Sequence, residues 1–68
     1  MEAFLATLST DDGAVWIGWI EDGGQIVEHR SGPEWKPILS WLRTRGTQVK
    51  SVWPKDIPPD LIAAHRTG

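Results

Sequence analysis

Residues 13–30, GAVWIGWIEDGGQIVEHR, decide the fold of this chain, because they have the pattern of two β-strands joined by a glycine-rich turn. The first of these strands, residues 15–20, is apolar throughout. Successive side chains of a strand point to opposite faces of a sheet, so Trp16 and Trp19 lie on opposite faces. The stretch therefore predicts a strand with two apolar faces, each of which needs a cover or a partner.

The residues before this stretch predict a strand that pairs with it. Residues 4–8, FLATL, are followed by the turn signal DDG at 11–13, where glycine supplies the positive φ of a tight hairpin. With residues 12 and 13 as a two-residue loop, Leu8 lies opposite Ile17. The face predicted to be the core then carries Phe4, Ala6, Leu8, Val15, Ile17 and Trp19, and the other face carries Leu5, Thr7, Ser9, Trp16, Gly18 and Ile20.

Residues 25–30, QIVEHR, predict a third strand at the edge of the sheet. Its charged residues Glu28 and Arg30 discourage further pairing. The glycine pair at 23–24 allows a loop of two or of three residues, and a slip of one residue exchanges the faces of Ile26 and Val27. The register of this hairpin is therefore left open.

A helix is expected from Glu34 or Trp35 to Arg45, with Gly46 as its C-cap. Residues 31–34, SGPE, resemble a capping box, but a helix starting there would place Pro37 in its second turn, where the proline ring clashes. The spacing i, i+3, i+4, i+7 predicts that one stripe of the helix faces the core, with Trp41 at its flank. The stripe consists of Trp35, Ile38, Leu39 and Leu42.

The remaining residues predict a fourth strand, Gln48 to Trp53, an extended connector at 57–60 and a short helix, Leu61 to Arg66. The expected order is βββαβα, a three-stranded antiparallel meander followed by a helix, a fourth strand and a short terminal helix. This order predicts a small two-layer α+β sandwich, with residues 1–68 as one domain.

In such a sandwich the first helix is expected to cover the core face with Trp19 and to leave the face with Trp16 open. An open apolar patch of this kind usually marks an interaction surface. The alternative is that the terminal helix folds back over Trp16 and closes that face.

Composition limits the possible roles of the chain. It has 68 residues, five tryptophans, no cysteine and a net charge of −2. So small a core is marginal without disulfides, and oligomerisation is a common remedy. No apolar run has the length of about 18 residues that a membrane span needs, and the first residues contain an acid and no base, so we expect a cytoplasmic protein with no membrane partner. Residues 1–32 carry a net charge of −5 and residues 33–68 a net charge of +3.

The order of elements over residues 1–53 resembles the first half of a ribonuclease-H-like domain and the small antitoxin domains that share this arrangement. The ribonuclease-H-like enzymes hold a divalent metal with an acidic residue in the first strand. In this chain the first strand has no carboxylate after Glu2. The resemblance therefore implies no metal-dependent nuclease activity here.

Other catalytic patterns are also lacking, so we expect no enzyme and no metal or cofactor. His29 and His65 do not form a spaced pair of metal ligands. A set of Ser31, His29 and Asp22 has no feature that marks the serine as a nucleophile. The glycine pair at 23–24 does not continue into a phosphate-binding loop.

Two binding functions remain. The first is a protein–protein interaction module, accessory, inhibitory or regulatory, which binds a protein partner or forms a homodimer through the open sheet face. Its expected contact residues are Trp16, Leu5, Ile20 and Val27. The alternative is a nucleic-acid-binding or antitoxin-like regulator with a basic surface that carries aromatic rings. Its expected residues are Arg43, Arg45, Lys50, Lys55, Trp41 and Trp53, although the isoelectric point near 5.5 lies far below the usual values of about 9 or more.

Overall fold

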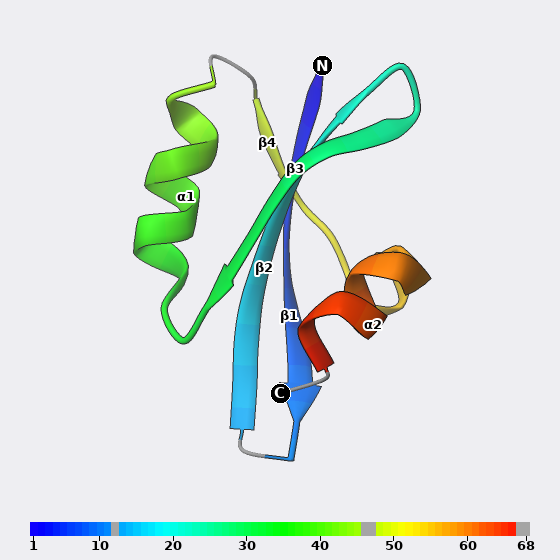
Figure 1. Cartoon of the computed structure of the whole chain (residues 1–68). Coiled ribbons are helices and arrows are strands. Elements are labelled where there is room, and N and C mark those ends of the chain that lie inside the picture. Colours follow the sequence, from blue (N-terminus) through cyan, green and yellow to red (C-terminus); the bar gives the residue numbers. More distant parts are fainter. Residues whose placement is uncertain (12, 46–47, 67–68) are drawn as a thin grey trace.

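The computed structural model describes residues 1–11, 13–45 and 48–66 of the chain (Figure 1). In these residues four strands form one sheet in the order β3-β2-β1-β4. The antiparallel strands are β1 (Glu2–Thr10), β2 (Gly13–Asp22) and β3 (Gln25–Gly32), and the fourth is β4 (Val49–Ser51). β4 pairs in parallel with β1, because the chain crosses over through a helix before it returns to the sheet.

The helical elements are α1 (Trp35–Arg43), a 3-10 turn η1 (Pro54–Asp56) and α2 (Pro59–Arg66). The predicted α+β class and the element order βββαβα are confirmed. The fourth strand is shorter than the expected range 48–53, because the chain leaves the sheet and forms η1 with Pro54 in its first turn. The expected C-cap Gly46 lies outside the described residues.

The hairpin of β1 and β2 has its predicted faces but a different register. Thr10 pairs with Gly13 and Leu8 with Val15, so the chain turns one residue earlier than expected. The predicted pairing of Leu8 with Ile17 is therefore wrong. Gly13, with φ 125°, begins β2 instead of standing in the loop. The register differs from the predicted one by two residues, and a shift of two leaves every side chain on its predicted face.

The hairpin of β2 and β3 has a two-residue turn at Gly23 and Gly24, which both have positive φ, 61° and 83°. The register then shifts at a bulge between Ile20 and Glu21, so that Ile26 packs in a core cluster while Val27 stays 52% exposed. β3 is an edge strand, as predicted.

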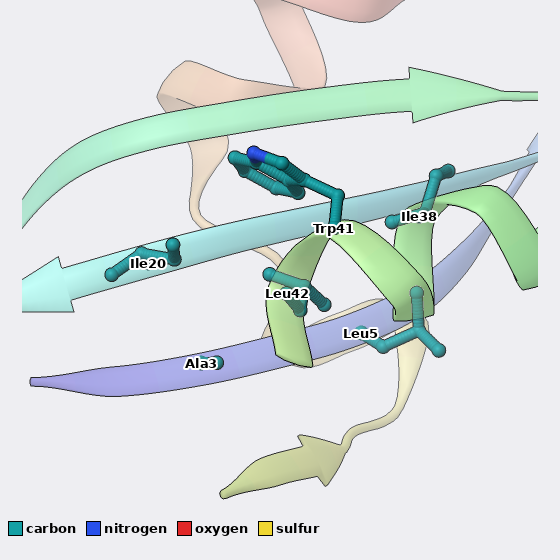
Figure 2. Packing of buried hydrophobic residues seen from close by; sticks show 6 residues of the cluster. All are labelled: Ala3, Leu5, Ile20, Ile38, Trp41 and Leu42. Atoms are coloured by element: carbon teal, nitrogen blue, oxygen red, sulfur yellow. The ribbon is translucent and has the colours of Figure 1, made fainter. Parts of the chain in front are cut away.

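Each face of the sheet has its own hydrophobic cluster and its own helix. Figure 1 shows α1, in green, and α2, in orange to red, on opposite sides of the strands. The α1 cluster consists of Ala3, Leu5, Ile20, Ile38, Trp41 and Leu42 (Figure 2). The α2 cluster consists of Ala6, Leu8, Ile17, Trp19, Ile57 and Leu61.

The expected placement of the helices is therefore wrong. α1 covers the face that carries Trp16 and Gly18, while the segment with Ile57 and α2 covers the face with Trp19. The physical reason is the shape of the two faces. Gly18 leaves a shallow site that the Ile38 side chain fills, whereas Trp19 stacks on Phe4 with the ring centroids 5.3 Å apart.

The buried side of α1 is also turned relative to the predicted stripe. Ile38, Trp41 and Leu42 are buried, whereas Trp35, expected in the core, is 42% exposed. Trp41 reaches past β2 towards β3, where the guanidinium of Arg30 lies 4.8 Å from its ring centroid (Figure 2). The helix thus presents its 38/41/42 side to the sheet.

No helix in the described ranges is long and apolar enough to cross a membrane. The cytoplasmic location expected from the sequence remains a prediction.

Because α1 packs closely against Gly18, replacing Gly18 by alanine should lower stability more than replacing Gly32 does. An added Cβ at Gly18 would lie 2.5 Å from Ile38 Cγ2 and 3.0 Å from Leu42 Cδ1, and the β-branched Ile38 has little freedom to move away. We expect Gly18→Ala to lower the free energy of unfolding by about 1–3 kcal/mol in urea titrations.

Gly32→Ala is the matched control, because its Cβ would meet Ile38 Cδ1 at an ordinary 3.8 Å. This variant should keep the stability of the natural chain or gain up to about 1 kcal/mol. Equal losses of unfolding free energy in the two variants would contradict the close packing of α1 against Gly18.

Candidate functional site

A groove of about 540 Å³ lies between α1 and the edge of the sheet that is formed by β1 and β4. We call it the α1–β4 groove. Its lining residues are Leu5, Trp16, Trp35, Leu39, Arg43, Gln48, Val49 and Ser51. A size of this order and a largely apolar lining are typical of protein sites that bind ligands.

The helix wall of the groove is a second stripe on α1. Trp35, Leu39 and Arg43 are spaced by four residues, so they lie above one another on one side of the helix. The buried stripe that faces the sheet occupies the neighbouring side. α1 thus uses one side for the core and another for the groove.

The sheet wall comes from three strands. Val49 and Ser51 of β4 pair with Ala3 and Leu5 of β1, and in a strand residues two apart share a face. Trp16 of β2 is half-buried and packs against the α1 cluster while it lines the groove. The tryptophan that the sequence placed on an open sheet face therefore stands in a groove wall.

The electrostatic character of the groove is set by one cation. Among the residues that the structure describes, Arg43 is the only charged one in the lining, and no acid lines the groove. In the described ranges the two ion pairs are Arg45 with Glu28 at 2.6 Å and Lys50 with Glu2 at 3.7 Å, and neither involves Arg43. The groove therefore favours a ligand that combines apolar surface with negative charge.

The predicted partner-binding residues do not form one surface. Leu5 and Ile20 are 8% and 1% exposed, because α1 lies over their face, so the expectation that this face is open is wrong. Leu5 still borders the groove. Val27 is exposed, but it lies on β3, at the sheet edge opposite β4.

The predicted nucleic-acid residues are divided among several places, and two of the four cations have acidic partners. Arg45 pairs with Glu28, and Lys50 pairs with Glu2. Arg43 lines the groove, while Lys55 lies in η1 next to Trp53.

The two tryptophans of that prediction also differ. Trp53 is 72% exposed, but Trp41 is only 9% exposed, and Arg30 and Arg45 lie 4.8 and 5.8 Å from its ring centroid. A ring covered in this way cannot stack on a base. Trp53 is therefore the one aromatic ring of the predicted set that is accessible.

The predicted serine triad is not assembled. Ser31 pairs with Ile17 and Asp22 pairs with Gln25, so the two lie at different ends of the β2–β3 ladder. Five residues along a strand correspond to about 16 Å. His29 pairs with Trp19 between them, and the side chain of His65 lies outside the described part. Among the described residues no group of three or more His, Cys, Asp and Glu could hold a metal ion.

Comparison with known proteins provides no relative. No family model matches the chain, and neither the curated proteins nor the solved structures contain a significant match. The resemblance to the ribonuclease-H-like arrangement therefore rests on the order of the elements alone.

Sequence reasoning missed five groove residues, namely Trp35, Leu39, Gln48, Val49 and Ser51. The i, i+4, i+8 spacing of Trp35, Leu39 and Arg43 is a signal that could have indicated a second stripe on the helix. Val49 carried no such signal, since its role depends on the parallel pairing of β4 with β1.

Trp41 and Trp35 of α1 have different surroundings, so their replacement by alanine should lower the free energy of unfolding by different amounts. Trp41→Ala should lower the free energy of unfolding by about 3–5 kcal/mol, because it empties a buried site. Trp35→Ala should lower it by less than about 1 kcal/mol, because the ring is part of an exposed groove wall. Urea unfolding of the two variants measures both values, and a loss at Trp35 as large as that at Trp41 would show that Trp35 is core.

Proposed function

We propose that this chain is a small non-catalytic interaction module that binds a protein partner through the α1–β4 groove. The observation that carries the proposal is the position of Trp16 and Trp35. Both line an open groove, although each face of the sheet already has a helix and a hydrophobic cluster. Apolar surface that the fold leaves open after its core is complete is typical of a binding site.

The chemistry of the lining supports this proposal. Tryptophan provides much apolar contact area with few rotatable bonds, and it is enriched among residues that dominate binding energies. Arg43 and Gln48 add polar groups that can fix the orientation of a bound segment. A regulatory, accessory or inhibitory role would use the same contacts.

Two other proposals have less support. A homodimer made by stacking the Trp16 faces would need α1 to leave Ile20, which is 1% exposed. Binding to nucleic acid would depend on Arg43, Lys55 and Trp53, since Trp41 is buried and the other two cations have acidic partners. We therefore place the binding site in the groove.

A photo-crosslinking experiment tests the proposed function. Trp35 is replaced by benzoylphenylalanine in cells of the source organism, and the chain is analysed by mass after irradiation. We expect a covalent adduct with another protein, because the ketone stands in the groove wall.

The control is the same replacement at Val27, which is 52% exposed on the opposite edge of the sheet. The chain with benzoylphenylalanine at position 27 should give no adduct of that mass. A second control is Leu39→Asp, which puts a charge into the groove and should remove the adduct formed at position 35. Equal adducts at both positions, or none at position 35, would contradict a partner site in the groove.

The same proposal predicts that the chain has little affinity for DNA or RNA. Fluorescence anisotropy with a short labelled strand should show no binding at physiological salt. Binding that falls steeply between low and high salt, and that is lost in the double variant Arg43→Ala, Arg45→Ala, would favour the nucleic-acid proposal instead.

A further inference from the structure

β4 leaves one side of its backbone open at the edge of the sheet. In the described part of the chain it pairs only with β1, and the Val52 N–H donates to the Leu5 carbonyl at 3.0 Å. Backbone groups of successive residues point to alternate sides of a strand, so residues 50 and 52 face β1. The N–H and C=O groups of Val49 and Ser51 therefore point away from the sheet.

The same two residues have side chains that line the α1–β4 groove. A strand that pairs with the open side of β4 would therefore extend the floor of the groove. Every second side chain of that strand would stand on the groove side, next to Trp35 and Leu39. Main-chain pairing and apolar contacts are thus available to one extended ligand.

We propose that β4 accepts an extended acidic segment of a partner protein as an added strand. The groove takes the apolar side chains of that segment, and Arg43 and Lys50 take its carboxylates. This inference rests on the proposed function, because it specifies which kind of partner segment the groove binds. Addition of a strand to a sheet edge is a common way in which domains recognise peptides.

Charge complementarity selects an acidic segment. Arg43 lies in the groove, and Lys50 stands on the other face of β4, 6.0 Å from the Phe4 ring centroid. Lys50 and its partner Glu2 are 58% and 59% exposed, and an exposed ion pair of this kind contributes little, so an incoming carboxylate can replace Glu2. Both faces of an added strand would thus meet a cation, and a basic segment would be repelled.

The same charges disfavour a second copy of this chain on β4. β4 has three residues, so the antiparallel register of two copies related by a twofold axis that pairs all of them is centred on Lys50. Each Lys50 would then stand opposite the other, and like charges directly opposite in a ladder are destabilising. The occupant is therefore a strand of another protein.

The opposite edge of the sheet is less suited to strand addition. β3 carries a bulge next to Val27, and its Glu28 is bound to Arg45. Bulges and charged residues are features that protect edges from further pairing. β4, by contrast, has a groove beside it, although its three residues limit the number of ladder bonds.

The peptide acetyl-VEVEVE-amide is a probe of this proposal, because it is extended, acidic and apolar on alternate positions. Isothermal calorimetry with the natural chain should show binding at micromolar concentrations of the peptide. Replacement of each glutamate of the peptide by glutamine should weaken binding several-fold. An absence of binding, or equal binding of the two peptides, would overturn the proposal.

Two variants of the chain test the position of the peptide. Ser51→Pro removes an N–H that points away from the sheet and keeps the bonds of residues 50 and 52 to β1, so we expect at least a tenfold loss of affinity. The glutamates of this peptide stand on the Lys50 face of β4 when its valines enter the groove, so Lys50→Gln should weaken binding about threefold, as expected for one exposed charge pair. Lys55→Gln is the matched control, since Lys55 is an exposed cation outside the groove, and it should bind like the natural chain.

Circular dichroism checks that Ser51→Pro is folded, and a peptide with N-methylated amides on alternate residues provides the same test without a change in the protein. If folded Ser51→Pro and the N-methylated peptide both bind with full affinity, strand addition is wrong. The proposed function then still stands on the crosslink at position 35. A light-scattering mass of twice the chain, lost in Ser51→Pro, would show that a second copy occupies β4 and would also overturn the proposal.

Discussion

The structure depends on the close contact between α1 and Gly18 of the strand β2. A side chain at this position would collide with Ile38, so only glycine lets the helix pack directly against the strand backbone. With α1 in this position, Leu42 and Trp41 also pack against the sheet, and together they bury the face of β2 that carries Ile20. The opposite face, with Trp19, is left to Ile57 and α2. A strand that is apolar on both faces is therefore explained by one helix on each face, without a partner chain.

The position of α1 on the sheet also creates the groove. With its 38/41/42 side on the sheet, the helix turns the stripe of Trp35, Leu39 and Arg43 towards β4. β4 is short and lies at the edge, so it forms one wall and leaves the other side of its backbone open. Apolar surface, an unpaired strand edge and cations thus meet at one place. The proposed binding of an acidic, extended segment uses all three.

Much of the fold could be predicted because hydrophobic periodicity and glycine turns are local signals. The faces of β1 and β2, the edge position of β3 and the start of α1 at Trp35 all follow from them. The side of a helix that packs against the sheet is not determined by the local sequence of the helix. Trp35, Ile38, Leu39 and Leu42 form a good stripe, but the deciding feature was the absence of a side chain at Gly18, which a count of apolar residues does not register. The groove was missed for the same reason, since it exists only after α1 is placed.

The central claim is that the α1–β4 groove and the open side of β4 form the binding site. The most direct test is a nuclear magnetic resonance titration of the nitrogen-15-labelled chain with acetyl-VEVEVE-amide. We predict that the largest shifts occur at the backbone amides of residues 48–51 and at the indole N–H groups of Trp16 and Trp35, all of which belong to the groove or to β4. Shifts that concentrate on β3 or α2, with residues 48–51 unchanged, would contradict the account.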